Sequence, residues 1–328
     1  MHNHFEDAYK LVYSFANYGE PGHVCFVAGA SGAGKTTLIQ LLATELFNES
    51  VQEEKIPLIS LTANLSQQGR FSQKNLIFDI FAALHDPFRS DPFEVLPRDI
   101  LTTASDKIDD LAEWRWTSII ERLAKAYGLV VLIIDEGQLM CLAPGRHSPS
   151  DYVESLRVLA MKAKIRIIIA GTYDMLEVWN YSSHINRRSI TVNINRYDKT
   201  KKEMAQFLGV LKGIELQCSL PSKLLTEHAS ECYEWSCGVP GEVFSQVMRA
   251  KLKWKASDSD IVLWKHFESS KHLPSQLSLL KLEVDAGEAI LFAKDSAATE
   301  HPHQQVVNSP PKNKRKSRSP IRSAVGMK

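Results

Sequence analysis

Gly-Ala-Ser-Gly-Ala-Gly-Lys-Thr occupies residues 29–36 and directly follows the apolar run His23-Val24-Cys25-Phe26-Val27-Ala28. The apolar run predicts a buried strand, and the residues from Thr36 onward predict a helix. A glycine-rich loop between a strand and a helix is the context in which Gly-x-x-x-x-Gly-Lys-Thr binds phosphate. An ordinary glycine turn would not need Lys35 and Thr36 after its last glycine. The stretch therefore predicts an α/β fold that binds a nucleoside triphosphate.

The residues of this loop indicate how the ligand would be held. Glycines allow the conformations that turn successive N–H groups toward phosphate oxygens, and the helix N-terminus adds partial positive charge. Lys35 can reach the β- and γ-phosphates, and the Thr36 hydroxyl can ligate Mg²⁺. We therefore expect ATP and Mg²⁺ as ligands. The predicted nucleotide-binding residues are Gly29, Ala30, Ser31, Gly32, Ala33, Gly34, Lys35, Thr36 and Thr37.

The composition is that of a globular chain, with 44% apolar residues and a net charge of +1 over 328 residues. This length allows a large α/β domain, a smaller domain and a tail, and the net charge neither favours nor excludes nucleic acid. Cys25 lies in an apolar strand, which favours a reduced, cytoplasmic chain over a disulfide framework. Cys232 and Cys237 have no second ligand pair, which argues against zinc. Because no apolar run has membrane-spanning length, we expect a soluble protein without a membrane partner.

Apolar, β-rich runs alternate with helical segments along the first two thirds of the chain. The runs predict strands at 23–28, 56–61, 129–134, 165–170 and 189–194. The segments between them predict helices at 36–48, 73–84, 106–127 and 151–163. Continuous apolar strands alternating with helices are typical of a parallel sheet covered on both faces. We therefore expect a five-stranded parallel sheet flanked by helices.

After the last strand, the sequence predicts helices alone, at 199–211, 221–235 and 241–253. A proline-containing segment at 85–99 predicts a surface loop, and the polar, basic C-terminus predicts disorder. We therefore divide the chain into a core domain (1–197), a small helical domain (198–255), a C-terminal helical extension (256–295) and a disordered basic tail (296–328).

A strand that ends in two acids supplies the second half of the predicted site. Residues 130–134 are apolar, and Asp135 and Glu136 follow them. In a parallel sheet these carboxylates emerge at the carboxyl edge, beside the phosphate-binding loop. Asp135 would hold Mg²⁺ through water, and Glu136 would polarise the water that attacks the γ-phosphate. An acid pair can also simply end a strand, but next to an intact loop it favours an ATPase over a small-molecule kinase.

Two further positions are candidates for catalysis. Thr172 follows the fourth predicted strand, where a hydroxyl can touch the γ-phosphate, although a plain Gly-Thr turn is the alternative. Arg187 and Arg188 precede the fifth strand. An arginine at a domain edge can stabilise transition-state charge at the γ-phosphate of a neighbouring subunit, whereas a solvated surface arginine is the alternative.

With these pieces in order, the chain resembles an AAA+ ATPase, and more narrowly the TnsC/TniB group of ATP-dependent target-selection regulators of transposons. The resemblance covers roughly residues 5–255. It implies that Arg188 is the arginine finger, with Arg187 as second choice, and that the small helical domain is an AAA+ lid. One departure is the stretch 236–242, which has no arginine where many AAA+ proteins carry one in the lid. The resemblance rests on the loop 29–36, on Asp135-Glu136, on Ile169-Ala170-Gly171-Thr172, and on Arg188 shortly before Arg196-Tyr197.

This resemblance implies a function and a set of partners. ATP-bound subunits would assemble into a ring or helical filament on duplex DNA, recruit or activate a transposase together with target-selector proteins, and disassemble when ATP is hydrolysed. The alternatives are another AAA+ ATPase, such as a helicase loader or DNA remodeller, and a small-molecule phosphotransferase, which fits Asp135-Glu136 poorly. The candidate DNA-contacting residues are Arg89, Arg98 and Arg146, and the tail residues Lys312, Lys314, Arg315, Lys316 and Arg318.

Overall fold

A computed structural model of the chain describes residues 3–50, 57–66, 69–84, 113–142, 149–176 and 183–297. Arg89, Arg98 and Arg146 lie outside these ranges, as do the segment 85–99 and residues 298–328 of the predicted tail, so the predictions about them stay predictions. None of the helices in the described ranges combines the length and the apolar character needed to cross a bilayer.

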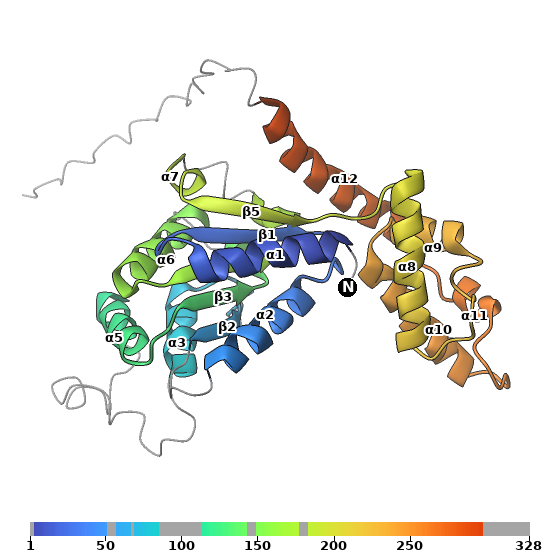
Figure 1. The fold of residues 1–328 in the computed structure, drawn as a ribbon, viewed down its shortest axis with the longest axis horizontal. Helices are drawn as coiled ribbons and strands as arrows, with labels where there is room; N and C mark the ends of the chain where they lie inside the picture. Colours follow the sequence, from blue (N-terminus) through green and yellow to red (C-terminus); the bar gives the residue numbers. More distant parts are fainter. Residues whose placement is uncertain are drawn as a thin grey trace, which may run out of the picture.

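Five parallel strands form one sheet in the order β2-β3-β4-β1-β5 (Figure 1). β1 lies between β4 and β5, so Val24 pairs with both Ile167 and Ser189 at the start of the strand. The predicted five-stranded parallel sheet is confirmed, and each strand lies within two residues of its predicted position. The strands are β1 (Val24–Gly29), β2 (Leu58–Thr62), β3 (Val131–Asp135), β4 (Arg166–Gly171) and β5 (Ser189–Ile194).

Helices cover both faces of this sheet, because successive strand residues point to opposite sides. Phe26 and Leu132 pack on α3 (Gln73–Leu84), α5 (Glu113–Ala126) and α6 (Pro149–Ala163). Cys25 and Val27 pack on α1 (Asn3–Tyr18) and α2 (Lys35–Ser50). The predicted helices α2, α3 and α6 are present. Helix α5 covers most of the described part of the predicted helix 106–127, and α1 was not predicted.

A second, helical body follows β5, and we call it the lid. Its helices are α8 (Lys201–Gln217), α9 (Ala229–Ser236), α10 (Pro240–Lys255) and α11 (Trp264–Glu268). They share one apolar cluster that contains Phe207, Leu211, Val247 and Phe267. Because Phe267 belongs to this cluster, the apolar core of the lid reaches beyond residue 255, where we predicted its boundary.

The predicted helix at 221–235 is wrong in its first half. Residues 222–228 form turns, and α9 begins only at Ala229. The cause is the buried carboxylate of Glu215, whose Oε1 accepts the backbone N–H of Leu225 over 2.7 Å and that of Thr226 over 3.0 Å. These two N–H groups pair with a side chain instead of with helix carbonyls, so the helix starts later.

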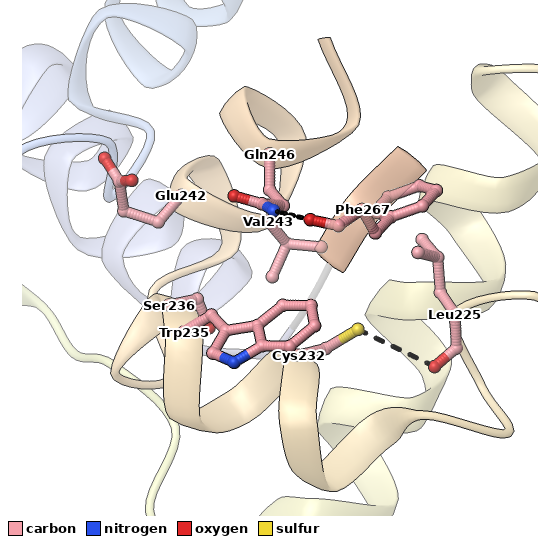
Figure 2. Close-up of a pocket in the computed structure, with 8 residues that line it drawn as sticks. All are labelled: Leu225, Cys232, Trp235, Ser236, Glu242, Val243, Gln246 and Phe267. Carbon is pink, nitrogen blue, oxygen red and sulfur yellow. Dashed lines mark hydrogen bonds between the residues drawn. The ribbon is translucent and has the colours of Figure 1, made fainter. Parts of the chain in front are cut away.

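The interior of the lid leaves little empty space. A cavity of about 10 Å³ lies between α9, α10 and α11 (Figure 2). Gln246 crosses it and donates from Nε2 to the Phe267 carbonyl over 2.9 Å. A cavity of this size holds at most one water molecule, so it is no ligand site. Its lining residues are Leu225, Cys232, Trp235, Ser236, Glu242, Val243, Gln246 and Phe267.

The helix α12 (Pro274–Ala297) runs from the lid back to the core (Figure 1). Val284 is fully buried in the core cluster. A Cβ at Gly287 would lie 2.1 Å from the Tyr173 ring, so only glycine permits this approach. Arg196 forms ion pairs with Asp285 at 2.6 Å and Glu288 at 2.9 Å. The sequence indicated no role for the segment 256–295, and the structure shows that its helix α12 packs against the core.

Candidate active site

The loop 29–36 leaves the carboxyl end of β1 and leads into α2. Gly32 and Gly34 have φ angles of +76° and +101°, which glycine adopts without the steric cost that a side chain would bring. The ammonium of Lys35 is buried, and its Nζ donates to the carbonyls of Gly29 over 3.0 Å and Ala30 over 2.8 Å. The loop therefore wraps around its own lysine at the edge of the sheet.

Burial lowers the pKa of Lys35. The negative charges of Asp135, Glu136 and Glu283 act in the opposite direction but do not fully offset the loss of water. A buried ammonium with too little compensating charge gains from an additional anion nearby. The electrostatics of the loop thus fit a bound phosphate.

Thr36 and Asp135 meet directly, although 99 residues separate them in the sequence. The Thr36 hydroxyl donates to Asp135 Oδ2 over 2.8 Å, and the backbone N–H of Glu136 donates to Asp135 Oδ1 over 2.9 Å. Asp135 is only 7% exposed. A hydroxyl and a carboxylate are oxygen ligands that suit Mg²⁺. Mg²⁺ usually keeps several waters and binds through one or two carboxylates together with substrate phosphates.

Glu136 lies beside Asp135 at a sharp turn of the backbone, with a φ of +57° in the left-handed region. Its carboxylate accepts a hydrogen bond from Gln138 Nε2 over 2.5 Å. The backbone N–H of Thr172 donates to Gln138 Oε1 over 3.1 Å, and the Thr172 hydroxyl donates to Asp174 over 3.3 Å. Glu136, Gln138 and Thr172 all line one cleft. Gln138 was not among the predicted residues, and its position after the acid pair was the only signal.

This cleft opens between the phosphate-binding loop and the lid and has a volume of about 1170 Å³. Gly209 and Gly213, one helical turn apart on α8, line it, and an added Cβ would meet nothing within 4 Å at either position. Glycine inside a helix costs about 1 kcal/mol relative to alanine. Two such glycines facing the cleft leave room for the base and ribose of a nucleotide. Asn3 and Phe5 of α1 also line the cleft, and all four residues were missed in the sequence.

The lid touches the loop through backbone atoms. The N–H of Gly241 donates to the Gly32 carbonyl over 3.0 Å, and a Cβ at Gly241 would lie 2.1 Å from that oxygen. Gly238 is held equally closely, since a Cβ there would lie 2.2 Å from the Tyr197 carbonyl. Among the described residues, no arginine lines the cleft. The stretch 236–242 thus approaches the loop with glycines, where many AAA+ lids supply an arginine.

Arg188 does not join these residues. Its carbonyl accepts the N–H of Val24 over 3.0 Å, at the beginning of β1, whereas the loop follows the end of that strand. At about 3.3 Å per residue, the length of β1 separates Arg188 from its own loop by roughly 20 Å. This distance exceeds the reach of an arginine side chain. Arg187 and Arg188 are both exposed at this opposite edge of the sheet.

Residues 20–178 match the family model of an AAA domain, which spans β1 to β4 and includes the loop and both acids. No curated protein sequence matches the chain.

Several solved structures share this fold at low sequence identity. A Walker-type ATPase of Pyrococcus abyssi is 15% identical with a TM-score of 0.50, over 91% of this chain and 77% of that one. Aeropyrum pernix ORC1 in complex with DNA is 13% identical with a TM-score of 0.57, over 81% of this chain and 64% of that one. The ADP form of Aeropyrum pernix ORC2 is 10% identical with a TM-score of 0.54, over 81% and 66%. The chain thus spans about two thirds of each ORC protein. At such identities these likenesses establish the fold, which is that of a P-loop AAA+ ATPase.

Proposed function

We propose that this chain hydrolyses ATP in the cleft beneath the lid and that a neighbouring subunit completes the site. The match of residues 20–178 to the family model of an AAA domain supports this proposal. One observation carries this proposal. Lys35, Thr36, Asp135 and Glu136 meet at one edge of the sheet, whereas Arg188 lies at the other.

In the proposed reaction, Lys35 and the loop N–H groups bind the β- and γ-phosphates of ATP. Mg²⁺, held by Thr36 and Asp135, would neutralise phosphate charge. Glu136 accepts a proton from water while the water oxygen bonds to the γ-phosphorus. The bond between that phosphorus and the oxygen bridging to the β-phosphate breaks, and ADP and phosphate leave. Thr172 lines the cleft beside Glu136, where its hydroxyl can contact the γ-phosphate.

The position of Arg188 supports a shared site. Arg188 cannot reach the loop of its own chain. Because it is exposed and lies outside the cleft, it can instead reach the γ-phosphate bound by a neighbouring subunit. An arginine supplied in trans stabilises transition-state charge. A head-to-tail contact repeated between identical subunits yields a ring when it closes and a filament when it does not.

The proposed partners are duplex DNA, a transposase and target-selector proteins. This part rests on the resemblance of the motifs to the TnsC/TniB group, and the DNA-bound Aeropyrum pernix ORC1 gives a precedent for DNA binding by a protein of similar fold. ATP would favour assembly on target DNA, where the protein recruits or activates the transposase, and hydrolysis would reverse assembly. A helicase loader or DNA remodeller would use the same site and differ in its partner.

Electron microscopy of the full chain with duplex DNA tests this proposal. With a nonhydrolysable ATP analogue we expect rings or filaments on the DNA, and with ATP we expect them to disappear as phosphate is released. Lys35→Ala, the matched control, should not assemble. Monomers under every condition would contradict the shared site. Assembly that loads a helicase but leaves strand transfer by a transposase unchanged would contradict the role in transposition.

A further inference from the structure

Gln138 connects Glu136, which follows β3, with Thr172, which follows β4. It lies in the short 3-10 helix η2 (Gly137–Leu142), which follows β3. Its side-chain amide accepts from the Thr172 N–H at the end of β4 over 3.1 Å and donates to the Glu136 carboxylate over 2.5 Å. A single amide therefore links the proposed catalytic carboxylate to the neighbouring strand.

Two glycines make space for this amide. A Cβ at Gly171 would lie 2.6 Å from Gln138 Oε1, so any side chain there would displace the amide oxygen. A Cβ at Gly137 would lie 2.4 Å from Ile169 Cγ2, so a side chain there would push η2 away from β4. Glycine at both positions lets η2 and the end of β4 come close enough for Gln138 to bridge them.

The chemistry of the partners fixes the direction of the amide. A backbone N–H can only donate, so the Thr172 N–H must face the carbonyl oxygen of Gln138. The amide nitrogen then faces Glu136, whose ionised carboxylate can only accept. Asparagine has the same groups on a shorter side chain and cannot span both partners in this geometry. Glutamate has the same length but presents an acceptor to both.

We propose that Gln138 is a positioning residue, which holds the Glu136 carboxylate at a fixed place relative to Thr172 so that it can orient the attacking water. This inference rests on the proposed ATPase function. It also implies that a shift of the β4 end, for example when the γ-phosphate occupies the cleft beside Thr172, is passed to Glu136 through the amide.

The test separates this role from a purely structural one, in which Gln138 only satisfies the Thr172 N–H. Gln138→Glu keeps the length of the side chain and an acceptor for that N–H but removes the donor to Glu136. We expect kcat for ATP hydrolysis to fall at least tenfold, and the Kd for a nonhydrolysable ATP analogue to stay within about threefold of the wild-type value. A purely structural role predicts wild-type kcat for this variant, and that result would overturn the inference.

A double variant provides a second, independent readout. Gln138→Glu sets two carboxylates against each other and should lower the melting temperature, whereas Glu136→Gln combined with Gln138→Glu restores a donor and acceptor pair and should recover it. Because both residues act through one carboxylate, kcat of the double variant should equal that of Glu136→Gln alone. Losses that multiply would mean that Gln138 acts independently of Glu136, which contradicts the proposal.

Glu136→Gln alone distinguishes the failure of this inference from the failure of the proposed function. Normal turnover by that variant would remove Glu136 as the catalytic carboxylate, and with it the function as proposed. Slow turnover by Glu136→Gln together with normal turnover by Gln138→Glu would reject only the positioning role.

Discussion

The backbone N–H of Gly241 donates to the Gly32 carbonyl across 3.0 Å, and this bond joins the lid to the phosphate-binding loop. Neither residue has a side chain at the contact, and a Cβ at Gly241 would lie 2.1 Å from the Gly32 oxygen. The lid can therefore take this position over the cleft only because residue 241 is a glycine and has no Cβ atom.

Gly241→Ala should weaken ATP binding, because the added methyl group forces either the loop or the start of α10 to move. We expect the Kd for a nonhydrolysable ATP analogue, measured by calorimetry, to rise at least tenfold. Lys253→Ala, at an exposed position of α10 outside the cleft lining, is the control, and its affinity should stay within about threefold of wild type. Equal affinities for the two variants would show that the contact does not set the shape of the site.

Gly213 should separate helix stability from ligand binding. Gly213→Ala should raise the free energy of unfolding without ligand by up to about 1 kcal/mol, because alanine favours the helix. Gly213→Leu should fill the part of the cleft that we assign to the base and lower ATP affinity without unfolding the lid. Melting curves with and without ATP report both effects. A Gly213→Leu variant that ATP stabilises as strongly as wild type would contradict this assignment.

The ion pairs of Arg196 should contribute to the attachment of α12. Burial raises the pKa of Glu288, and Arg196 opposes this rise, so removing the arginine leaves a poorly compensated carboxyl group. Arg196→Ala should lower the free energy of unfolding by roughly 1–3 kcal/mol in urea titrations. Lys199→Ala breaks the exposed pair with Glu234 and should cost less than about 1 kcal/mol. Similar costs for the two variants would mean that α12 is held by its apolar contacts alone.

Glu203 of the lid contacts His4 of α1 and should make the stability of the protein depend on pH. Burial raises its pKa, but hydrogen bonds from the Asp198 N–H and His4 outweigh this, so the folded pKa lies below the ordinary value of 4.5. The unfolded state therefore binds more protons near that pH, and the stabilisation is complete above pH 4.5 and is lost as the pH falls further.

Glu203→Gln should remove this contribution. We expect the variant to be less stable than wild type at pH 7, with the difference shrinking below pH 4.5, when both are unfolded with urea across this range. Glu268→Gln, at an exposed position, serves as the control and should follow the wild-type curve. A difference between wild type and Glu203→Gln that stays constant with pH would exclude the carboxylate as its source.

The sequence allowed the sheet and half of the site to be predicted, because their signals are continuous in the chain. The central strands β1, β3 and β4 are buried on both faces, so each reads as one apolar run, and the loop 29–36 and Asp135-Glu136 sit at strand ends. The parallel order then brings the carboxyl ends together, which is why Thr36 and Asp135 meet across 99 residues.

The remaining features depend on contacts between distant residues. Gln138 gains its role only because Thr172, 34 residues away, turns an N–H toward it. The turns at 222–228 arise from Glu215, a carboxylate in the preceding helix whose burial the local pattern does not indicate. The return of α12 to the core requires Gly287 to fit against Tyr173. Local periodicity carries no information about such pairings.

Whether Arg188 of a neighbouring subunit completes each ATP site can be tested by mixing two inactive variants. Arg188→Ala keeps its own loop and Glu136, whereas Glu136→Gln keeps Arg188, so in a mixed assembly some sites regain every component. Each variant alone should hydrolyse ATP slowly on duplex DNA, and an equimolar mixture should recover a substantial fraction of wild-type turnover. A mixture no faster than the average of the two separate variants would show that Arg188 does not act on the site of a neighbouring subunit.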